Sequence, residues 1–328
     1  MGYQELLLVV ENYHLEVFEY ASVKLEELYQ IWNAEYGNIY PISAELFNRN
    51  IENIYMKASY VVVSNEKLIG FVIGKVWQDD YNIKTYEKIG WISLIYVLPK
   101  YRNQGIGTKL INLSIDALKE FGVHTINLGK DYNNFFPGLP IDLAKYRTWF
   151  QNRGFEFLYL THDLITRNNK NKFKIVNNNY KFTSALGFDK DLVIKFIETY
   201  WPGRWTKEAV DYYNNGGNGN EYLLCLNDKN EICGFAKVCF PNTLEKHMSY
   251  SLTWRTRFEA LGGIGPLGIA PDLRGQHLGY DIVAASVNTL VEYGVSEIII
   301  DWTGLLEFYR KLGFEVWKAY SYLYKTIN

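Results

Sequence analysis

The chain has 328 residues, 48% of them apolar, and a formal net charge of −2. This length is sufficient for two hydrophobic cores, and the nearly balanced charge gives no electrostatic basis for binding nucleic acid. The cysteines, Cys225, Cys233 and Cys239, are odd in number, and neither they nor the five histidines show metal-ligand spacing. We therefore expect two domains, reduced thiols, no metal ion and no nucleic-acid partner.

The N-terminal segment shows no targeting signal. Its apolar run, residues 6–10, is too short to span a membrane, and Glu5 and Glu11 stand where a signal peptide would be basic. Leu6 occupies the position at which a myristoylated chain carries serine or threonine. We expect a cytoplasmic protein that does not bind membranes.

The first elements alternate between helix and strand signals. Residues 5–20 favour extended structure, and Ser22 is expected to cap a helix that continues through Trp32. A second helix follows Pro41 and ends before Lys57. Three apolar runs then predict an antiparallel meander with strands at residues 59–64, 68–77 and 90–98.

The last of these strands leads into a glycine-containing turn and a long amphipathic helix. Gly105 and Gly107 let a ligand approach the backbone, and the first amides of the following helix present unpaired N–H groups to an anion. The helix runs to Gly122. The turn is therefore predicted to hold the diphosphate of a nucleotide-bearing cofactor.

The remainder of the first half contains a strand at residues 123–128, a loop at 131–140, a helix at 141–153 and a strand at 155–161. Residues 165–181 are rich in Asn and Lys and predict an exposed linker.

The order of elements then recurs, and so do short phrases of sequence. Residues 97–102 align with 269–274, and 153–156 align with 312–315. The first half has a longer spacing between these phrases, which a single insertion around the loop at 131–140 explains. We expect a tandem duplication with domains at 1–164 and 182–328 and a linker at 165–181.

The glycine turn with its basic entry, followed by a helix, a strand and the closing phrase Phe-Tyr-Arg-Lys-Leu-Gly-Phe at 308–314, resembles the GNAT superfamily of acyl-CoA-dependent N-acyltransferases. The resemblance covers nearly the whole chain as two copies, and it is similar to a bacterial tandem-domain group. It implies an α+β fold in which each domain has a mixed, mostly antiparallel sheet flanked by helices.

The resemblance also implies acetyl-CoA as cofactor and direct attack of a bound amine on the thioester. Pantetheine would pair with the strand before each glycine turn, and the diphosphate would contact the turn itself. The cofactor-binding residues implied in the first half are Ile95, Tyr96, Val97, Arg102, Asn103, Gln104, Gly105, Ile106, Gly107 and Thr108. Those implied in the second half are Leu267, Gly268, Ile269, Arg274, Gly275, Gln276, His277, Leu278, Gly279 and Tyr280.

In this family a tyrosine of the last helix often protonates the departing thiolate, and the matching residue is Tyr309 in the second half but Phe150 in the first. The second half departs elsewhere, because His277 stands where the first glycine belongs. Loss of the acid affects the chemical step directly, so we expect the chemistry in the second half with Tyr309 as the acid. A core tyrosine is the alternative.

Other candidates have weaker support in the sequence. Glu87 and Glu259 precede the central strands as possible bases, and Asp301 and Thr303 follow the fifth strand of the second half. Residues 263–268 match a dinucleotide fingerprint but enter a strand and contain a proline, so we discount the match. Four tryptophans are expected near a ligand groove: Trp201, Trp205, Trp254 and Trp302.

The resulting hypothesis is an N-acetyltransferase that acts on a primary amine of a small molecule or a peptide. The alternative is a catalytically inactive protein that binds acyl-CoA for sensing or assembly. Amine-dependent turnover distinguishes the two.

Overall fold

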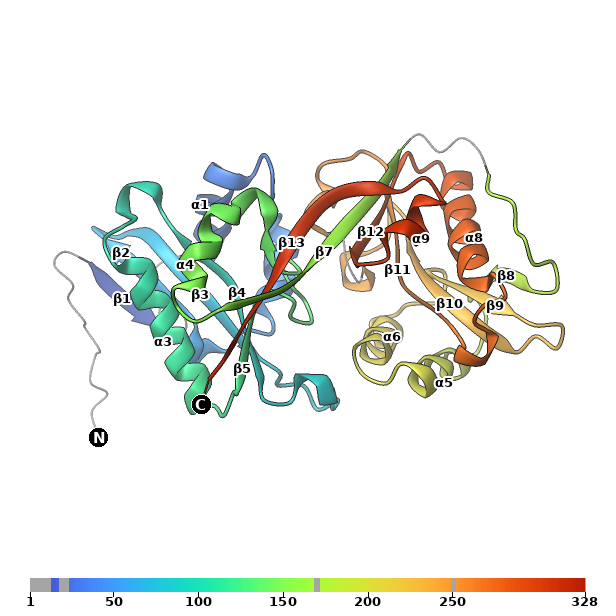
Figure 1. Ribbon diagram of the computed structural model, residues 1–328, viewed down its shortest axis with the longest axis horizontal. Coiled ribbons are helices and arrows are strands. Elements are labelled where there is room, and N and C mark those ends of the chain that lie inside the picture. The colour runs from blue at the N-terminus through green and yellow to red at the C-terminus, as the bar shows by residue number, and fades with distance from the viewer. Residues whose placement is uncertain (1–12, 18–23, 168–171, 249–251, 328) are drawn as a thin grey trace. The chain divides into compact units, whose positions relative to one another are not determined.

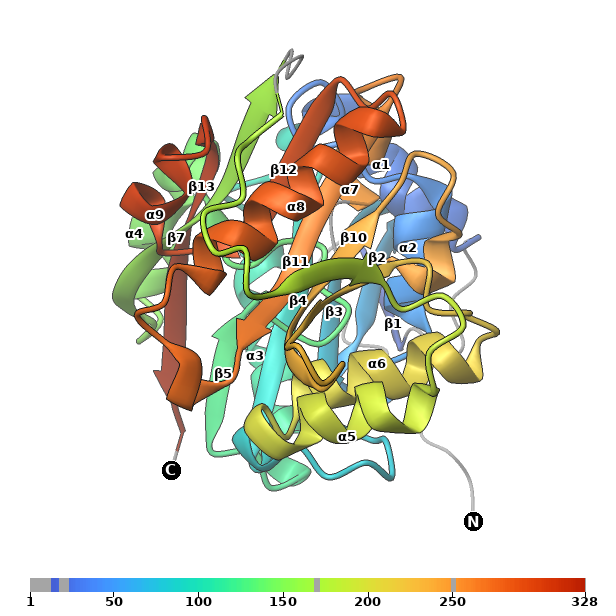
Figure 2. The same ribbon diagram turned by 90° about the vertical axis from the view of Figure 1, so that its right-hand side faces the viewer.

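The computed structural model describes residues 13–17, 24–167, 172–248 and 252–327. The chain forms two compact units, each with its own sheet and helices (Figures 1 and 2). The first unit holds the described residues up to Asp80, Thr85–Leu160 and the C-terminal segment from Tyr320. The second holds Tyr81–Lys84 and Thr161–Ala319.

The sheet of the first unit has the strand order β1-β2-β3-β4-β5-β13. β4 and β5 are parallel, and the other neighbouring pairs are antiparallel. The elements of this unit are β1 (His14–Val17), α1 (Glu26–Tyr36), α2 (Ala44–Ile51), β2 (Tyr60–Ser64), β3 (Lys67–Val76), β4 (Ile89–Val97), α3 (Ile106–Glu120), β5 (Thr125–Leu128), β6 (Leu139–Pro140), a 3-10 helix (Ile141–Tyr146) and α4 (Arg147–Gln151).

Helices cover both faces of this sheet. Phe71 of β3 contacts Tyr96, whose ring meets Trp32 of α1. Gly74, three residues later on β3, lies against α3, where a Cβ would come within 2.8 Å of the Ser114 hydroxyl oxygen. Because side chains alternate along a strand, α1 and α3 pack on opposite faces.

A β-bulge interrupts β4 at Ser93. Ile73 pairs with Leu94 and Gly74 pairs with Ile92, so Ser93 is the extra residue on β4. The parallel register of β4 with β5 ends at the pair Ile92 and Leu128. A bulge re-aims its side chain, and here it does so where the two strands stop pairing.

The second unit repeats this plan with the order β7-β12-β11-β10-β9-β8. α8 packs on β10 and β11, and α5 packs against α6 and β10 (Figure 2). Its elements are β8 (Lys181–Ser184), α5 (Lys190–Tyr200), α6 (Arg204–Asn214), β9 (Tyr222–Leu226), β10 (Ile232–Cys239), α7 (Leu252–Arg255), β11 (Leu261–Ile269), α8 (Leu278–Glu292), β12 (Glu297–Thr303) and α9 (Leu306–Arg310).

The units do not follow the boundaries expected from the sequence. β7 (Glu156–Arg167) and β13 (Glu315–Thr326) each contribute to both units. The last residues of β13 pair with β5 in the first unit, and the end of β7 pairs with β12 in the second. Each sheet is therefore completed by a strand segment from the other half of the sequence, which a boundary placed at residue 164 or 182 does not capture.

The expected linker at 165–181 is only partly a linker, because residues 165–167 belong to β7 and Lys181 begins β8. Residues 172–180 form a segment that docks on α8. The backbone amide and carbonyl of Phe173 bond to the Asn288 side chain of α8 at 2.8 and 2.9 Å, and the amides of Val176 and Asn177 donate to the Asp281 carboxylate at 2.7 and 2.9 Å. Phe173 and Ile175 pack on the core. Because residues 173–177 cover the side of α8 that does not face the sheet, the helix is apolar around most of its circumference.

Several local expectations need correction or fall outside the described residues. The predicted helix at 141–153 is a 3-10 segment followed by the short α4. The first helix begins at Glu26, and Ser22 lies outside the described residues. Extended structure was expected for residues 5–20. Of these, residues 13–17 are described, and they contain the strand β1. No helix among the described residues is long and apolar enough to span a membrane.

The cysteines are buried free thiols. Burial raises the pKa of Cys225 to about 12, so this thiol is unreactive at neutral pH. Among the described residues no group of three or more His, Cys, Asp or Glu side chains is arranged to hold a metal ion.

Candidate functional site

A cavity of about 490 Å³ lies within the first unit. Residues 92–97 of β4 form one wall, and Leu128 and Gly129 at the end of β5 form the opposite wall. The cavity therefore occupies the gap that opens where β4 and β5 stop pairing. Its lining also includes residues of the glycine turn, Trp149 and Phe150 of α4, and an aromatic cluster formed by Trp32 and Tyr36 of α1 with Tyr146.

The glycine turn is shaped as an anion site. Gly105 caps α3 with φ of 84°, a left-handed conformation that favours glycine. The first bond inside the helix runs from the Lys109 amide to the Gly105 carbonyl at 2.9 Å, so the amides of residues 105–108 have no acceptor within the helix. Gly107 and Thr108 line the cavity. An anion at this place would meet these amides and the positive end of the helix dipole.

Arg153 adds a positive charge beside this turn. Its guanidinium donates to the Thr108 hydroxyl and to the Trp149 carbonyl, and lies 3.8 Å from the centre of the Trp149 ring. Its counterpart in the repeat is Leu312, so the second unit lacks this charge. Arginine is well suited to phosphate, which favours the first turn as the diphosphate site.

Most residues expected to bind the cofactor in the first half line this cavity. Eight of them do so: Ile95, Tyr96, Val97, Arg102, Asn103, Gly105, Gly107 and Thr108. Gln104 and Ile106 are not among the lining residues. Gln104 is exposed and accepts a hydrogen bond from Tyr13, whereas the side chain of Ile106 is buried.

Arg102 points away from the glycine turn, toward α1. It donates to both oxygens of Glu35 and, at 2.8 Å, to the Val97 carbonyl. The Tyr96 hydroxyl also donates to Glu35, at 2.9 Å. Burial alone would raise the pKa of Glu35, but these bonds together with one from Tyr36 lower it below its ordinary value. The carboxylate is therefore held ionised by its neighbours.

Two tyrosines of the aromatic lining contact each other through their hydroxyl groups. The Tyr36 and Tyr146 hydroxyl oxygens are 3.0 Å apart, and both residues line the cavity. Burial and the bond to Tyr146 raise the pKa of Tyr36. Tyr36 is therefore a neutral hydrogen-bonding group, and Tyr146 stands four residues before Phe150 in the sequence.

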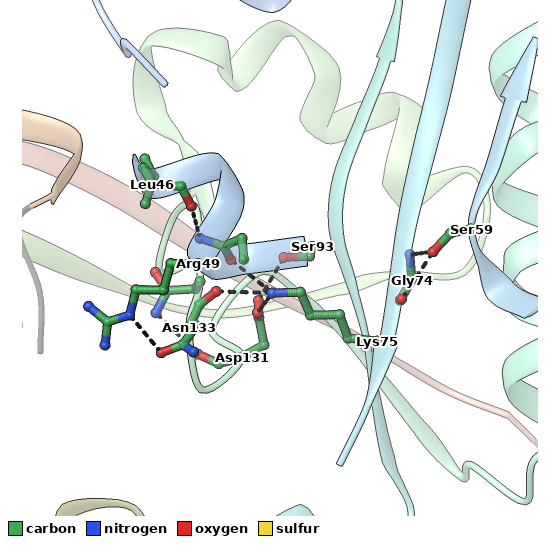
Figure 3. A network of polar contacts seen from close by, with 10 residues as sticks. Leu46, Arg49, Ser59, Gly74, Lys75, Ser93, Asp131 and Asn133 are labelled. Atoms are coloured by element: carbon green, nitrogen blue, oxygen red, sulfur yellow. Dashed lines mark hydrogen bonds and ion pairs between the residues drawn. The ribbon is translucent and has the colours of Figure 1, made fainter. Parts of the chain in front are cut away.

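A buried ion pair lies directly behind Ser93 (Figure 3). Lys75 Nζ of β3 is 2.5 Å from Asp131 Oδ2 and is also bonded to Asn50 Oδ1 at 2.8 Å and to the Asn133 carbonyl at 3.0 Å. The Ser93 hydroxyl donates to Asp131 Oδ1 at 2.9 Å. Burial lowers the pKa of Lys75, against the raising effect of Asp131. Of this network, Ser93 lines the cavity.

The second unit replaces all three of these side chains. Lys75 pairs with Trp91 in the first sheet, and Cys239 pairs with Gly263 at the same place in the second. The alignment that matches Trp91 with Gly263 also matches Ser93 with Gly265 and Asp131 with Thr303. The network is therefore specific to the first unit.

Tyr309, the expected acid, lies in the core of the second unit with 5% of its surface exposed. Its ring contacts Phe308 and Phe314. Burial and, to a smaller extent, Asp301 raise the pKa of Tyr309 to about 12. Its catalytic role stays a prediction, and its counterpart Phe150 lines the cavity of the first unit without an ionisable group.

The second glycine turn keeps the backbone shape of the first. His277 takes the place of Gly105 with φ of 63°, and the first bond inside α8 runs from the Asp281 amide to its carbonyl at 3.0 Å. The His277 side chain is exposed. On the strand expected to pair with pantetheine, Gly268 lies under Trp201, where a Cβ would come within 2.4 Å of the ring.

The remaining members of the second set occupy the same region. Leu267 and Ile269 lie on β11, Arg274, Gly275 and Gln276 are exposed, Leu278 is buried, and Gly279 and Tyr280 are half-buried in the first turn of α8. Residues 263–268, the discounted fingerprint, lie wholly within β11. Their part in cofactor binding stays a prediction.

The weaker base candidates differ in their surroundings. Glu87 and Glu259 are exposed, and Glu87 is not among the lining residues of the cavity. Thr303 is buried, and its hydroxyl accepts from the Leu305 amide at 3.1 Å. Burial and the neighbouring Asp163 carboxylate raise the pKa of Asp301 well above its ordinary value.

The four tryptophans lie in the second unit and serve its packing and polar contacts. Trp201 and Trp205 contact each other in a tilted arrangement with a centroid distance of 5.7 Å. The Trp254 indole donates to Asp163 at 3.0 Å, and Trp302 lies 4.2 Å below the Arg204 guanidinium.

Sequence reasoning missed the polar residues that line the cavity of the first unit or belong to the hydrogen-bonded groups behind its lining. They are Glu35, Tyr36, Lys75, Ser93, Asp131, Tyr146 and Arg153. They come from different strands, helices and loops, so no local spacing marks them. A lysine inside an otherwise apolar strand was the one available signal.

Comparison with known proteins gives a family match over both halves. The model of the acetyltransferase (GNAT) family matches residues 25–136 and 191–314. A curated relative, N-alpha-acetyltransferase 30 of Schizosaccharomyces pombe, is 37% identical over 76 residues, which are 23% of this chain and 48% of that protein.

Solved structures show the same fold. A GCN5-related glucosamine N-acetyltransferase region of a fungal multi-domain GH3 β-N-acetylglucosaminidase aligns with 97% of this chain and 38% of its own, with 22% identity and a TM-score of 0.83. A tandem GNAT protein from the clavulanic acid biosynthesis pathway aligns with 92% of this chain and 95% of its own, with 13% identity and a TM-score of 0.61. The chain thus spans about half of the Schizosaccharomyces pombe relative and 38% of the fungal chain.

Proposed function

Because the chain belongs to the acetyltransferase (GNAT) family, we propose that it transfers an acetyl group from acetyl-CoA to a primary amine, and that the transfer takes place in the cavity of the first unit. One observation carries the proposal. A single cavity joins the amides of the Gly105–Thr108 turn to the unpaired edge of β4 beyond Ser93. A diphosphate needs hydrogen-bond donors such as these amides, and an extended pantetheine arm needs a free strand edge with which to pair.

The groups present fit the cofactor. The diphosphate would contact the amides of residues 105–108, and Arg153 would add its charge. Pantetheine would pair with residues 95–97 of β4 as an added strand, which uses main-chain groups that β5 no longer occupies. The thioester would then reach the bulge at Ser93. When bound, acetyl-CoA supplies the activated acyl carbon, and the protein supplies position and proton transfer.

The acceptor would enter from the side of α1. Tyr36, Tyr96 and Tyr146 line that end of the cavity, with Glu35 and Arg102 forming a polar border behind them. This surface combines aromatic faces with hydroxyl groups, which suits a sugar amine or a peptide N-terminus. The named relatives act on amines of these two classes, which supports testing both.

The test is release of free CoA with a panel of primary amines that includes glucosamine and a short peptide with a free α-amine. We expect CoA release that depends on the amine and yields the N-acetyl product by mass spectrometry. Tight binding of acetyl-CoA with no turnover across the panel would favour the alternative of an inactive acyl-CoA-binding protein.

A further inference from the structure

We infer that Ser93, Asp131 and Lys75 form a proton relay, in which Ser93 takes the proton from the attacking amine and passes its own proton to Asp131. The inference rests on the proposed function and assigns a base, and the returning acid, to the first unit, where phenylalanine stands at the position of the family's tyrosine. Phe150 has no proton to give, and Glu87 is exposed and outside the lining of the cavity.

Position is the first argument. Ser93 is the extra residue of the β4 bulge, at the point where β4 leaves β5. Pantetheine paired with residues 95–97 would end its extended arm beside this residue. Ser93 is 5% exposed and lines the cavity, so its hydroxyl lies between the reaction space and the buried Asp131.

The hydrogen-bond direction is the second argument. Asp131 accepts from Ser93 at Oδ1 and from Lys75 at Oδ2, so the hydroxyl proton of Ser93 already points at a carboxylate (Figure 3). The lone pairs of the Ser93 oxygen are then free to accept a proton from the cavity side. A serine held in this way acts as a base only through the carboxylate behind it.

The third argument is the set of contacts that holds Asp131 in place. Asp131 is 2% exposed and pairs with Lys75, which is also bonded to Asn50 and to the Asn133 carbonyl. Arg49 of α2 bonds to Asn133 and adds a second positive charge on this side. Lys75 is therefore a positioning residue, which holds the Asp131 carboxyl group in place with its Oδ1 toward Ser93.

The reaction balances without another reactant. The amine nitrogen bonds to the thioester carbon, its proton moves to Ser93 Oγ, and the Ser93 proton moves to Asp131 Oδ1. The carbon–sulfur bond then breaks, and its electron pair leaves on the CoA sulfur. The proton returns from Asp131 through Ser93 to this thiolate, which is the stronger base of the two. The products are the N-acetyl amine and CoA thiol.

The second unit supports the assignment by contrast. It has the tyrosine at position 309 but carries Gly265, Thr303 and Cys239 where the first unit has Ser93, Asp131 and Lys75. The unit that has phenylalanine at the position of the tyrosine is thus the one that carries the Ser93, Asp131 and Lys75 network.

The experiment compares Ser93→Ala with Ser286→Ala, which removes another buried, hydrogen-bonded hydroxyl, from α8 of the second unit. Turnover is measured with glucosamine or the free-amine peptide, whichever the wild type acetylates faster. We expect Ser93→Ala to lower kcat by about 10- to 100-fold at pH 7, with the acetyl-CoA Kd within threefold of wild type. Ser286→Ala keeps the wild-type kcat.

The pH profile separates a proton relay from a structural role. In the wild type the relay takes the proton from the amine, so kcat/KM should reach its plateau at a lower pH. In Ser93→Ala the rate should continue to rise with pH, because it depends on the fraction of the acceptor that is already the free amine. A double variant, Lys75→Met with Asp131→Asn, removes the relay without leaving a buried charge unpaired, and it should show the same profile. Ser93→Ala with a kcat within twofold of wild type and an unchanged pH profile would overturn the relay while leaving the proposed function in place. Absence of any turnover by the wild type would overturn both.

Discussion

Substitution of Gly107 by valine should abolish tight binding of acetyl-CoA. Gly107 lines the cavity, and a Cβ there would lie 3.4 Å from the Trp149 ring. We therefore expect the methyl groups of valine to take up space proposed for the diphosphate. Gly107 lies in the first turn of α3 and has helical geometry, and valine has no worse helix propensity than glycine. The effect should therefore be on binding and not on folding.

The magnitude follows from the contacts that are lost. Two amide–phosphate hydrogen bonds at about 1.5 kcal/mol each give about 3 kcal/mol, which is roughly a hundredfold increase in Kd. The matched control is Gly279→Val in the second unit, where a Cβ would lie 3.8 Å from the Phe308 ring. Titration calorimetry with acetyl-CoA should find the Kd of this control within threefold of wild type. A weakened Gly279→Val with a normal Gly107→Val would refute the reasoning and place the cofactor in the second unit.

The other predictions concern acid groups. Tyr309→Phe should keep turnover within about twofold if transfer occurs in the first unit, and a loss of tenfold or more in CoA release would assign the acid to Tyr309. Glu35→Gln should lower the unfolding free energy by less than about 1 kcal/mol, because its ion pair with Arg102 is about a quarter exposed. The pKa of Glu35 is lowered in the folded state, so its stabilising effect is present above the ordinary glutamate pKa and lost as the pH falls; chemical denaturation should show the two proteins converging in acid. The pKa of Asp301 is raised by burial and by Asp163, so wild-type stability falls as the pH rises above the ordinary aspartate pKa. Asp301→Asn should therefore melt at a higher temperature at pH 7, since one unit of pKa corresponds to about 1.4 kcal/mol, and an equal or lower melting temperature there would contradict this account.

The sequence was sufficient for the features that are encoded locally. The glycine turn, its helix and the strand before it are contiguous, and their conformational needs are those of Gly105 and of an unpaired helix N-terminus. The repeat was visible because similar residues stand at the same elements in both halves. Pro99 and Pro271 each follow a strand and precede the glycine turn, and similar phrases surround Gly154 and Gly313.

Features that depend on distant parts of the chain were not predictable in this way. Lys75, Ser93 and Asp131 come from two strands and a loop, and only the register of β3 with β4 brings them together. The exchange of β7 and β13 between units also leaves no local pattern, because both strands read as ordinary closing strands of their own halves.

The choice of the active half shows the same limit. A missing tyrosine at Phe150 and a histidine at position 277 are visible in the sequence, but their consequences depend on the space around them. The cavity lies at Phe150 and Gly107, whereas Trp201 covers Gly268 on the corresponding strand of the second unit. Space and packing, which the sequence does not state, led us to favour the first unit.

The most direct test of the account is a crystal structure of the protein with CoA. We predict the diphosphate on the amides of residues 105–108, the pantetheine arm along residues 95–97 of β4, and the sulfur next to the Ser93 hydroxyl. CoA bound at the turn that contains His277, with the cavity of the first unit empty, would contradict the central claim.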